Sequence, residues 1–303
     1  MKRRDFLSLS AIGGMAVLTK ACSPAVEQTD EKTGAVLSAH PDARLHLASQ
    51  EGRAPGETLD EKLDFLEANG FVGIEPWGSS LPERVEEFQK ALQNRAVKMS
   101  AVTSGISGYL IAQDPEIRAE ARESVKRILE AAGTLGSPGL IIVPAFNHQP
   151  SLPHQEAREV LVEQLMELGE VAAKHNTSIL LEPLNRREAY FLRQLADAAA
   201  IAKDAESPGV GIMGDFWHMT WEETSDLGAV ISGGNYLRHM HIASRKRRLM
   251  PGEDEGDNYI DGFKGLKYIG YKGHVSLECG TEGDPAVTII AAANLMREQW
   301  ERA

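Results

Sequence analysis

Four short apolar runs in the second half of the chain each end in a side chain that can bind a metal ion. The runs are ILLEPLNR, GIMGDFWH, LRHMHIAS and HVSLECG, and the side chains are Glu182, Asp215, His241 and Glu278. Successive members of this set lie 33, 26 and 37 positions apart, which is about the length of one strand and one helix in a parallel α/β fold. In a closed parallel barrel the carboxyl ends of the strands share one face, so this spacing predicts that the four side chains meet there.

The rest of the chain from Arg44 onward shows the same alternation of apolar strands and amphipathic helices. The eight predicted strands are RLHLAS, FVGIEP, VKMSAVTS, GLIIVPAF, SILLEP, GVGIMGDF, LRHMHIA and HVSLEC. Helices are expected between them, including LPERVEEFQKALQNR after the second strand and a single helix at WEETSDLGAVI after the sixth. Because no long linker or change of composition interrupts the 303 residues, we predict an α/β fold with one domain, a (β/α)8 barrel over residues 44–303.

The first 22 residues have a different composition. Paired arginines at Arg3 and Arg4 precede an apolar stretch and then small residues before Cys22, which is the layout of an export signal. The segment KRRDFL resembles a twin-arginine signal. We therefore expect an exported protein, periplasmic or held at the membrane as a lipoprotein through Cys22; the alternative is a cleaved signal with an incidental cysteine. Residues 23–43, rich in Thr, Asp, Glu, Lys and Gly, are predicted to form a flexible tether.

The charge of the chain excludes one class of partner. The formal net charge is −12, and the first 21 residues are net basic, so the predicted barrel is more acidic still. An acidic surface repels phosphodiester backbones, and we expect no binding to nucleic acid. Cys22 and Cys279 do not suggest a disulfide framework. Alternation along the last strand turns Cys279 away from Glu278, which predicts a packed thiol.

The four strand-end residues form a hard set of ligands. Three carboxylates and one imidazole suit Mn²⁺ or Mg²⁺, with Co²⁺ or Zn²⁺ as further candidates. Three ionised carboxylates do not share one pocket unless a cation neutralises them. The alternative for any one of these residues is a side chain that caps the helix after its strand. Four together at this spacing favour a site for one divalent metal ion.

Five motifs together resemble one known family. They are ILLEPLNR, GDFWHM, HMHIA, the Pro-Gly pair after the seventh strand, and IGYKGHVSLE. From about residue 44 the chain resembles the sugar isomerase/epimerase group of the xylose isomerase-like TIM barrels, which includes ketose 3-epimerases, hydroxypyruvate isomerases, and inosose isomerases or dehydratases. The resemblance implies one divalent ion bound by Glu182, Asp215, His241 and Glu278. It also implies that Glu182 and Glu278 are the catalytic acid and base.

The implied activity is that of a metal-dependent sugar isomerase or epimerase, acting on a small carbohydrate (ketose, aldose or keto-sugar) through an enediolate. Return of the proton to the same carbon gives epimerisation and return to its neighbour gives isomerisation; the sequence leaves these and elimination open. A hydroxypyruvate isomerase, which the stretch EDEGDNY resembles, and an inosose dehydratase are the closer alternatives. An endonuclease IV-type repair enzyme requires more metal ligands and a basic DNA face. The non-enzyme alternative is an exported carbohydrate-binding lipoprotein.

The resemblance further implies residues that bind the substrate. His218, three positions after Asp215, matches the substrate-binding histidine of a D-x-x-H motif, and the alternative is a solvent-exposed loop histidine. Arg248 lies three positions before a Pro-Gly pair, where the resembling epimerases carry an arginine that binds substrate hydroxyls; Arg245 is the alternative. Asn185 belongs to a segment that shapes the pocket. The basic run around Arg248 is otherwise a solvated patch or a phosphate clamp.

Three residues of the first half are also expected to line the mouth of the barrel. They are Glu75 and Trp77 at the end of the second strand and His148 after the fourth. Trp77 would stack on the apolar face of a sugar, or it would belong to the core. His239, two positions before His241, points to the same side of its strand and is expected to line the pocket or to support His241. A homo-oligomer is a further expectation.

Overall fold

A parallel sheet of eight strands organises the computed structural model, which describes residues 38–303. The strands are β1 (His46–Gln50), β2 (Gly73–Glu75), β3 (Lys98–Met99), β4 (Leu140–Ile142), β5 (Ile179–Leu181), β6 (Val210–Asp215), β7 (Leu237–Ile242) and β8 (His274–Leu277). Their hydrogen-bonded order is β3-β2-β1-β8-β7-β6-β5-β4. A parallel bridge between Val102 and Leu140 joins the two ends of this order, so the sheet closes into a barrel. The predicted (β/α)8 architecture is confirmed.

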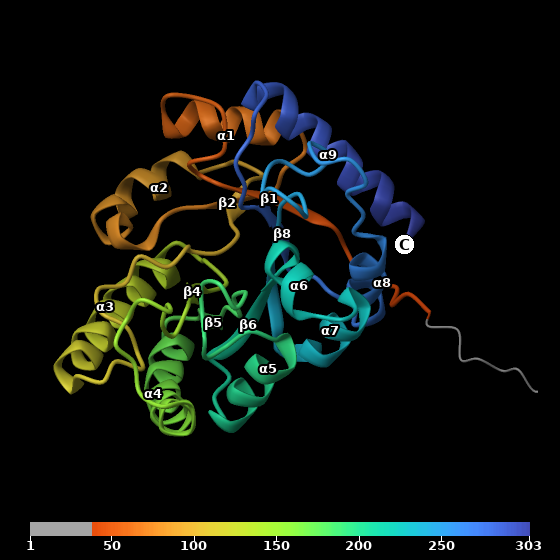
Figure 1. Ribbon diagram of the computed structural model, residues 1–303. Coiled ribbons are helices and arrows are strands. Elements are labelled where there is room, and N and C mark those ends of the chain that lie inside the picture. Colours follow the sequence, from red (N-terminus) through yellow and green to blue (C-terminus); the bar gives the residue numbers. More distant parts are fainter. Residues whose placement is uncertain (1–37) are drawn as a thin grey trace, which may run out of the picture. The chain divides into compact units, whose positions relative to one another are not determined.

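Helices surround the strands (Figure 1). They are α1 (Leu59–Ala68), α2 (Val85–Ala91), α3 (Pro115–Thr134), α4 (His154–Lys174), α5 (Leu195–Asp204), α6 (Phe216–Glu222), α7 (Asp226–Gly233), α8 (Ile260–Tyr268) and α9 (Pro285–Arg302). Several begin at a side chain that accepts a hydrogen bond from the first turn, such as Thr58 before α1 and Asp284 before α9. Within residues 38–303, no helix has both the length and the apolar character needed to cross a lipid bilayer.

One predicted helix is two. The stretch WEETSDLGAVI is expected to form a single helix, whereas α6 starts directly after β6 and ends at Glu222, and α7 starts at Asp226. The backbone of Glu223 is extended, and its carboxylate accepts a hydrogen bond from the backbone N–H of Leu195 at 2.8 Å. Ser225 then caps α7 by accepting from the N–H of Gly228. Local capping therefore divides a segment whose hydrophobic pattern alone is continuous.

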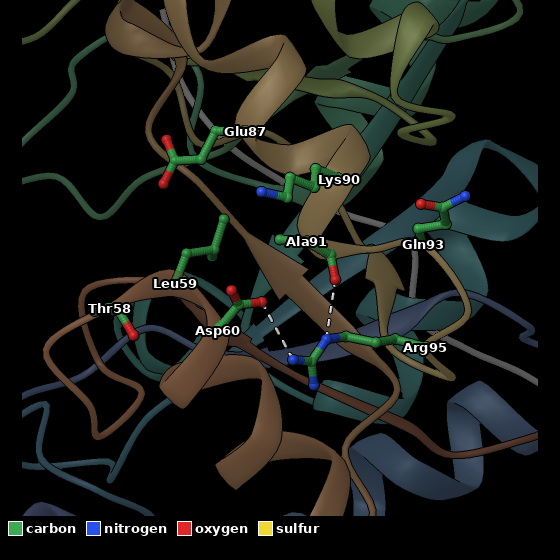
Figure 2. Close-up of a pocket in the computed structure, with 8 residues that line it drawn as sticks. All are labelled: Thr58, Leu59, Asp60, Glu87, Lys90, Ala91, Gln93 and Arg95. Carbon is green, nitrogen blue, oxygen red and sulfur yellow. Dashed lines mark hydrogen bonds and ion pairs between the residues drawn. The ribbon is translucent and has the colours of Figure 1, made fainter.

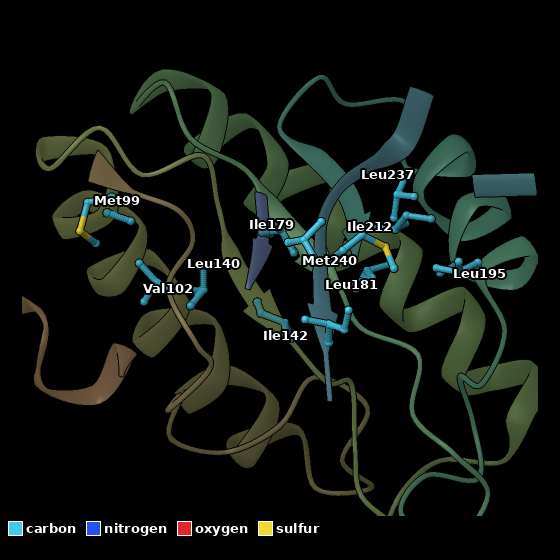
Figure 3. Packing of buried hydrophobic residues seen from close by; sticks show 14 of the residues in the cluster. Met99, Val102, Leu140, Ile142, Ile179, Leu181, Leu195, Ile212, Leu237 and Met240 are labelled. Atoms are coloured by element: carbon cyan, nitrogen blue, oxygen red, sulfur yellow. The ribbon is translucent and has the colours of Figure 1, made fainter. Parts of the chain in front are cut away.

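The two sides of the strands differ in character. Outward side chains, including Met99, Val102, Leu181 and Met240, pack against the helices in the main hydrophobic core (Figure 3). Inside the barrel a small apolar cluster joins Ala101, Ile141, Leu180 and Met213. The buried polar side chains of Glu75, Ser276, His239 and His241 also come from these strands or their ends. The barrel interior is therefore partly polar; Ser276, His239 and His241 lie on β7 and β8, and Glu75 ends β2.

The predicted export signal, residues 1–22, lies outside the described residues, as does most of the predicted tether. The last residues of the predicted tether contact the barrel. The backbone N–H of His40 donates to the carbonyl of Lys267 at 2.8 Å, and Lys272 forms an ion pair with Asp42. At the other end of the chain, Cys279 is buried and its sulfur lies 3.3 Å from the sulfur of Met250. The prediction of a packed thiol is confirmed.

Candidate active site

The carboxyl ends of β5, β6, β7 and β8 bring the four predicted ligands together. Ligand atoms of Glu182, Asp215, His241 and Glu278 all lie within 4.8 Å of one another. Three of the residues are buried, while the side chain of Glu278 is 22% exposed and opens the group to the barrel mouth. Two ligands on opposite sides of one ion, each at about 2.1 Å, are about 4.2 Å apart. A small inward movement therefore lets all four side chains contact one ion.

The charges of this group fit a divalent cation. Burial and the neighbouring charge of Glu278 raise the pKa of Glu182 well above its usual value. The pKa of Glu278 is lowered to about 2, because His241 and Arg248 outweigh the effect of burial. The buried Nδ1 atom of His241 lies 3.0 Å from Oε2 of Glu278 but has no hydrogen bond of good geometry. A cation would relieve the repulsion between the carboxylates and take the Nδ1 lone pair, so these residues fit a hard divalent ion.

Asp215 has two roles in one side chain. Its Oδ1 accepts a hydrogen bond of 2.8 Å from the backbone N–H of Trp217 and caps α6. Its Oδ2 faces the cluster, 3.1 Å from Nη2 of Arg248 and 3.6 Å from Nε2 of His218. Asp215 therefore caps the next helix, as the alternative for a strand-end residue states, but it also faces the cluster. The cap fixes the carboxylate so that its second oxygen points toward the other ligands.

His218 lies inside the site and only 2% of its side chain is exposed. Its Nδ1 accepts from the backbone N–H of Asn185 at 3.1 Å, with the Asn185 amide nitrogen 2.8 Å away. Burial lowers the pKa of the imidazole. The ring is therefore neutral and keeps its proton on Nε2, the atom that faces Asp215. His218 is a fixed hydrogen-bond donor toward the cluster, and the solvent-exposed alternative is wrong.

Asn185 acts on His218 from behind. The side chain of Asn185 is buried; its amide nitrogen lies 2.9 Å from Oε1 of Glu188, and its oxygen accepts from the N–H of Arg187. These contacts are all within the protein, and direct contact of Asn185 with a substrate stays a prediction. The adjacent Arg186 is 64% exposed and pairs with Glu222.

Arg248, and not Arg245, reaches the cluster from the loop after β7. Its Nη2 donates to Asp215 and to Oε2 of Glu278, and its guanidinium lies 4.5 Å from the ring centre of Trp217. The backbone of Arg248 adopts φ 58°, a region that residues other than glycine enter at a cost of about 1–3 kcal/mol. A hydrogen bond of 2.8 Å from the N–H of Gly280 to its carbonyl ties this loop to the end of β8.

The other arginines of this loop are engaged in its structure. Arg245 pairs with Asp226 and also donates to the carbonyl of Phe216 at 2.7 Å. Arg247 pairs with Asp254 at 2.6 Å and with Glu282 at 2.8 Å. Both guanidinium groups are paired with carboxylates, and the phosphate-clamp alternative, which includes the exposed Lys246, stays a prediction. These contacts hold the loop that presents Arg248.

The three predicted residues of the first half have different positions. Trp77 is 54% exposed, so the alternative that it belongs to the core is wrong. Glu75 has a fully buried carboxylate that contacts His239 and His241. His148 is exposed and stacks on Phe146 with ring centres 5.9 Å apart. Among the described contacts, none joins His148 to the cluster, and its role as a substrate contact stays a prediction.

A cavity of about 530 Å³ lies beside the cluster at the barrel mouth. It is lined by residues at or after the ends of β1, β2 and β3, by one residue of α1 and by one predicted ligand: Gln50, Glu51, Gly52, Arg53, Lys62, Glu75, Trp77, Thr103 and Glu278. A second cavity of about 470 Å³ lies between α1 and α2, where Arg95 pairs with Asp60 and donates to the carbonyl of Ala91 (Figure 2). The second cavity contains none of the four ligands, so the mouth cavity is the one next to the candidate chemistry.

Sequence reasoning missed two residues of the site. Glu188 contacts Asn185, and its Oε1 lies 4.0 Å from Nδ1 of His218. Trp217 carries the guanidinium of Arg248 on its ring. The available signals were weak: Glu188 lies three positions after Asn185 and Trp217 directly precedes His218. Neither residue type indicates a functional site from the sequence alone; only the positions of the loops bring the two side chains to the site.

A sequence model of the xylose isomerase-like TIM barrels matches residues 63–299. The chain belongs to this family. It is 29% identical over 230 residues to 3-dehydro-D-guloside 4-epimerase of Escherichia coli, covering 73% of this chain and 87% of that protein. It is 28% identical over 243 residues to D-psicose 3-epimerase of Ruminiclostridium cellulolyticum, covering 76% and 80%. These relatives support an isomerase-type enzyme.

Among solved structures, the crystal structure of an apo 3-keto-D-glucoside 4-epimerase from E. coli is similar to this chain. The TM-score is 0.77 with 27% sequence identity, and the match covers 84% of this chain and 100% of that structure.

Proposed function

We propose that this protein is a metal-dependent epimerase of keto-sugars. The observation that carries the proposal is the cluster of Glu182, Asp215, His241 and Glu278, whose ligand atoms lie within 4.8 Å of one another at the carboxyl end of the barrel. The family and the epimerase activities of its relatives support the same class of reaction.

The residues of the cluster divide the work. Asp215 and His241 would hold a divalent ion together with Glu182 and Glu278. When bound, such an ion polarises a substrate carbonyl and the neighbouring hydroxyl and lowers the pKa of the C–H bond between them. One glutamate takes that proton and leaves an enediolate; the other returns a proton to the same carbon from the opposite side, which inverts it. His218, through Nε2–H, and Arg248 would donate hydrogen bonds to substrate oxygens.

The substrate class that we propose is a keto-glycoside, a sugar with an oxidised carbon and a substituent at its anomeric position. The cavity of about 530 Å³ beside Glu278 offers room beyond the reacting sugar. The exposed ring of Trp77 on its wall is suited to stacking on an apolar sugar face. A relative that is named for a guloside supports the same choice.

Deuterium exchange tests the proposal. The protein loaded with Mn²⁺ is incubated in D2O with a panel of free ketoses and keto-glycosides, and each product is examined by NMR. We expect deuterium at a single carbon with inversion there. Glu278→Gln should reduce turnover by about 10²–10⁴-fold, the usual contribution of a positioned acid or base. Glu130→Gln, an exposed residue of α3, is the matched control. Absence of exchange in every sugar would overturn the enolisation mechanism.

We also propose export of the protein through the twin-arginine route, on the pattern of residues 1–22. Fusion of this segment to a reporter that is active only outside the cytoplasm tests the idea. Exchange of both Arg3 and Arg4 for lysine should abolish the signal. A reporter that stays inactive when fused to the native segment would contradict it.

A further inference from the structure

A third glutamate contacts the cluster from the opposite side of the barrel. Glu75, at the end of β2, has a side chain with 0% exposure. Both of its carboxylate oxygens lie 3.0 Å from Nε2 of His241, and its Oε2 lies 2.8 Å from Nε2 of His239. Thr103 and Gln50 donate further hydrogen bonds to Oε1. A buried carboxylate with this many donors is well satisfied.

The contact crosses the barrel interior. In the sheet order, β1 and β8 lie between β2 and β7, so Glu75 and the two histidines are not on neighbouring strands. The interior below Glu75 is crowded: a Cβ atom added at Gly73 would lie 2.8 Å from Cβ of Ala48 and 2.8 Å from Cδ2 of His274. The packing below therefore limits where the Glu75 carboxylate can move.

This contact decides which nitrogen of His241 is free. Because an ionised carboxylate only accepts hydrogen bonds, Nε2 of His241 carries a proton that it donates to Glu75. A divalent ion would take the place of a proton at Nδ1, whose lone pair would then face the other ligands. Nδ1 lies 3.0 Å from Oε2 of Glu278 and 3.9 Å from Oε1 of Glu182. Histidines that bind metal ions usually donate their other N–H to such a partner, which fixes the ring and raises its basicity.

We propose that Glu75 is a positioning residue, which orients His241 toward a divalent ion and is itself held by His239. Glu75 lines the mouth cavity as expected, and its carboxylate contacts the two imidazoles; its direct contact with a substrate stays a prediction. His239 supports this carboxylate through its Nε2, which lies 2.8 Å from Oε2 of Glu75, while its buried Nδ1 has no hydrogen-bond partner among the described residues. The inference rests on the proposed function only in that it requires a bound divalent ion.

A second ion between Glu75, His239 and His241 is the competing interpretation, since their ligand atoms also lie within 4.8 Å of one another. The observed N–O separations of 2.8–3.0 Å are those of hydrogen bonds. A second ion would also force His241 to bind one ion through each nitrogen. The number of ions per chain separates the two interpretations.

The experiment measures metal binding without any sugar. Metal-free full-length wild type, Glu75→Gln and Glu75→Asp are titrated with Mn²⁺ by calorimetry, and bound Mn²⁺ is followed by electron paramagnetic resonance. We expect one ion per chain in all three proteins, and an affinity about 10–100-fold lower in both variants. Glu51→Gln removes a carboxylate that lines the same cavity and pairs with Arg84; its affinity should change less than about threefold.

A measurement on the wild type guards against variants that fail to fold. Nitrogen NMR of histidine-labelled protein loaded with Mg²⁺ should show His241 protonated at Nε2. A proton on Nδ1, two ions per chain, or an unchanged Mn²⁺ affinity in Glu75→Gln would each overturn the inference. These readouts are independent of turnover. If metal binding depends on Glu75 but no sugar exchanges deuterium, this inference stands and the proposed function fails.

Discussion

The two halves of the barrel differ in what they contribute to the candidate site. The second half, from β5 to β8, supplies all four predicted ligands from consecutive strands, and β6 and β7 are six residues long. The first half, with β2 of three residues and β3 of two, supplies none of the four. It contributes the wall of the mouth cavity and the carboxylate of Glu75, which supports His241 from across the interior.

The difference shows that the predicted ligands and the supporting residue Glu75 reach the site through different parts of the fold. In the second half, strand pairing alone brings ligands together: Asp215 and His241 are direct partners in the register of β6 and β7. In the first half, Glu75 reaches the same centre only across the barrel interior, because β1 and β8 lie between β2 and β7. Three predictions test this comparison.

The largest effect is expected for Asp215, the second-half residue that both caps a helix and faces the cluster. Asp215→Asn keeps an oxygen that can accept from the N–H of Trp217 and removes one charged ligand. The Mn²⁺ affinity should fall at least about 100-fold, since the loss of a direct ligand exceeds that of an outer partner. Calorimetry measures the affinity, and thermal unfolding of the metal-free protein shows whether the cap survives.

Asp284→Asn is the matched control, because Asp284 caps α9 in the same way and lies outside the cluster. It should leave Mn²⁺ binding unchanged. Asp215→Ala should in addition destabilise the metal-free protein by about 1 kcal/mol through loss of the cap. If Asp215→Asn binds Mn²⁺ as tightly as wild type, Asp215 is a cap and nothing more.

A smaller effect is expected for Asp254, which holds the second-half loop that presents Arg248. Although burial raises the pKa of Asp254, hydrogen bonds from Ser244 and Arg247 hold it well below its usual range. The carboxylate therefore stabilises the fold above its unfolded pKa of about 3.9, and this contribution is lost as the pH falls below that value. Asp254→Asn should lower the free energy of unfolding at pH 7 by about 2 kcal/mol.

Denaturant unfolding at several pH values checks this prediction. The difference in the free energy of unfolding between wild type and Asp254→Asn should shrink between about pH 4 and pH 2, because the carboxylate becomes protonated below its unfolded pKa of about 3.9. Glu282→Gln is the control, since Glu282 pairs with the same Arg247 but is 67% exposed; it should cost less than about 1 kcal/mol. A difference that stays constant with pH would show that the charge of Asp254 is not what stabilises the loop.

The smallest effect is expected at the first-half wall. Trp77→Ala removes an exposed ring from the mouth cavity, so KM for a keto-glycoside should rise about threefold to tenfold with kcat nearly unchanged. Trp221, 38% exposed on α6, provides the control Trp221→Ala, which should not change KM. Steady-state kinetics decides; a fall in kcat with constant KM would place Trp77 in the reaction step instead of substrate binding.

Much of the second half was predictable from sequence because its contacts follow from local rules. Each predicted ligand stands at the carboxyl end of an apolar strand. Parallel strands place their carboxyl ends at one edge of the sheet. The same logic reaches Asp215 and His218, which are three positions apart across a strand-to-helix turn. The choice between Arg248 and Arg245 was not determined by spacing, because it depends on which guanidinium the loop buries against Asp226 and which against Glu278.

The sequence by itself determined the barrel, the four predicted ligands and their common edge, since strand alternation and unit length are properties of the chain. Only the tertiary structure decided the role of Glu75. Closure of the sheet places β2 across from β7, and burial makes a carboxylate there stable only where hydrogen-bond donors meet it; His239 and His241 are two of those donors. Glu75 is 164 positions from His239 and 166 positions from His241 in the sequence, and contacts over such separations leave no local sequence pattern.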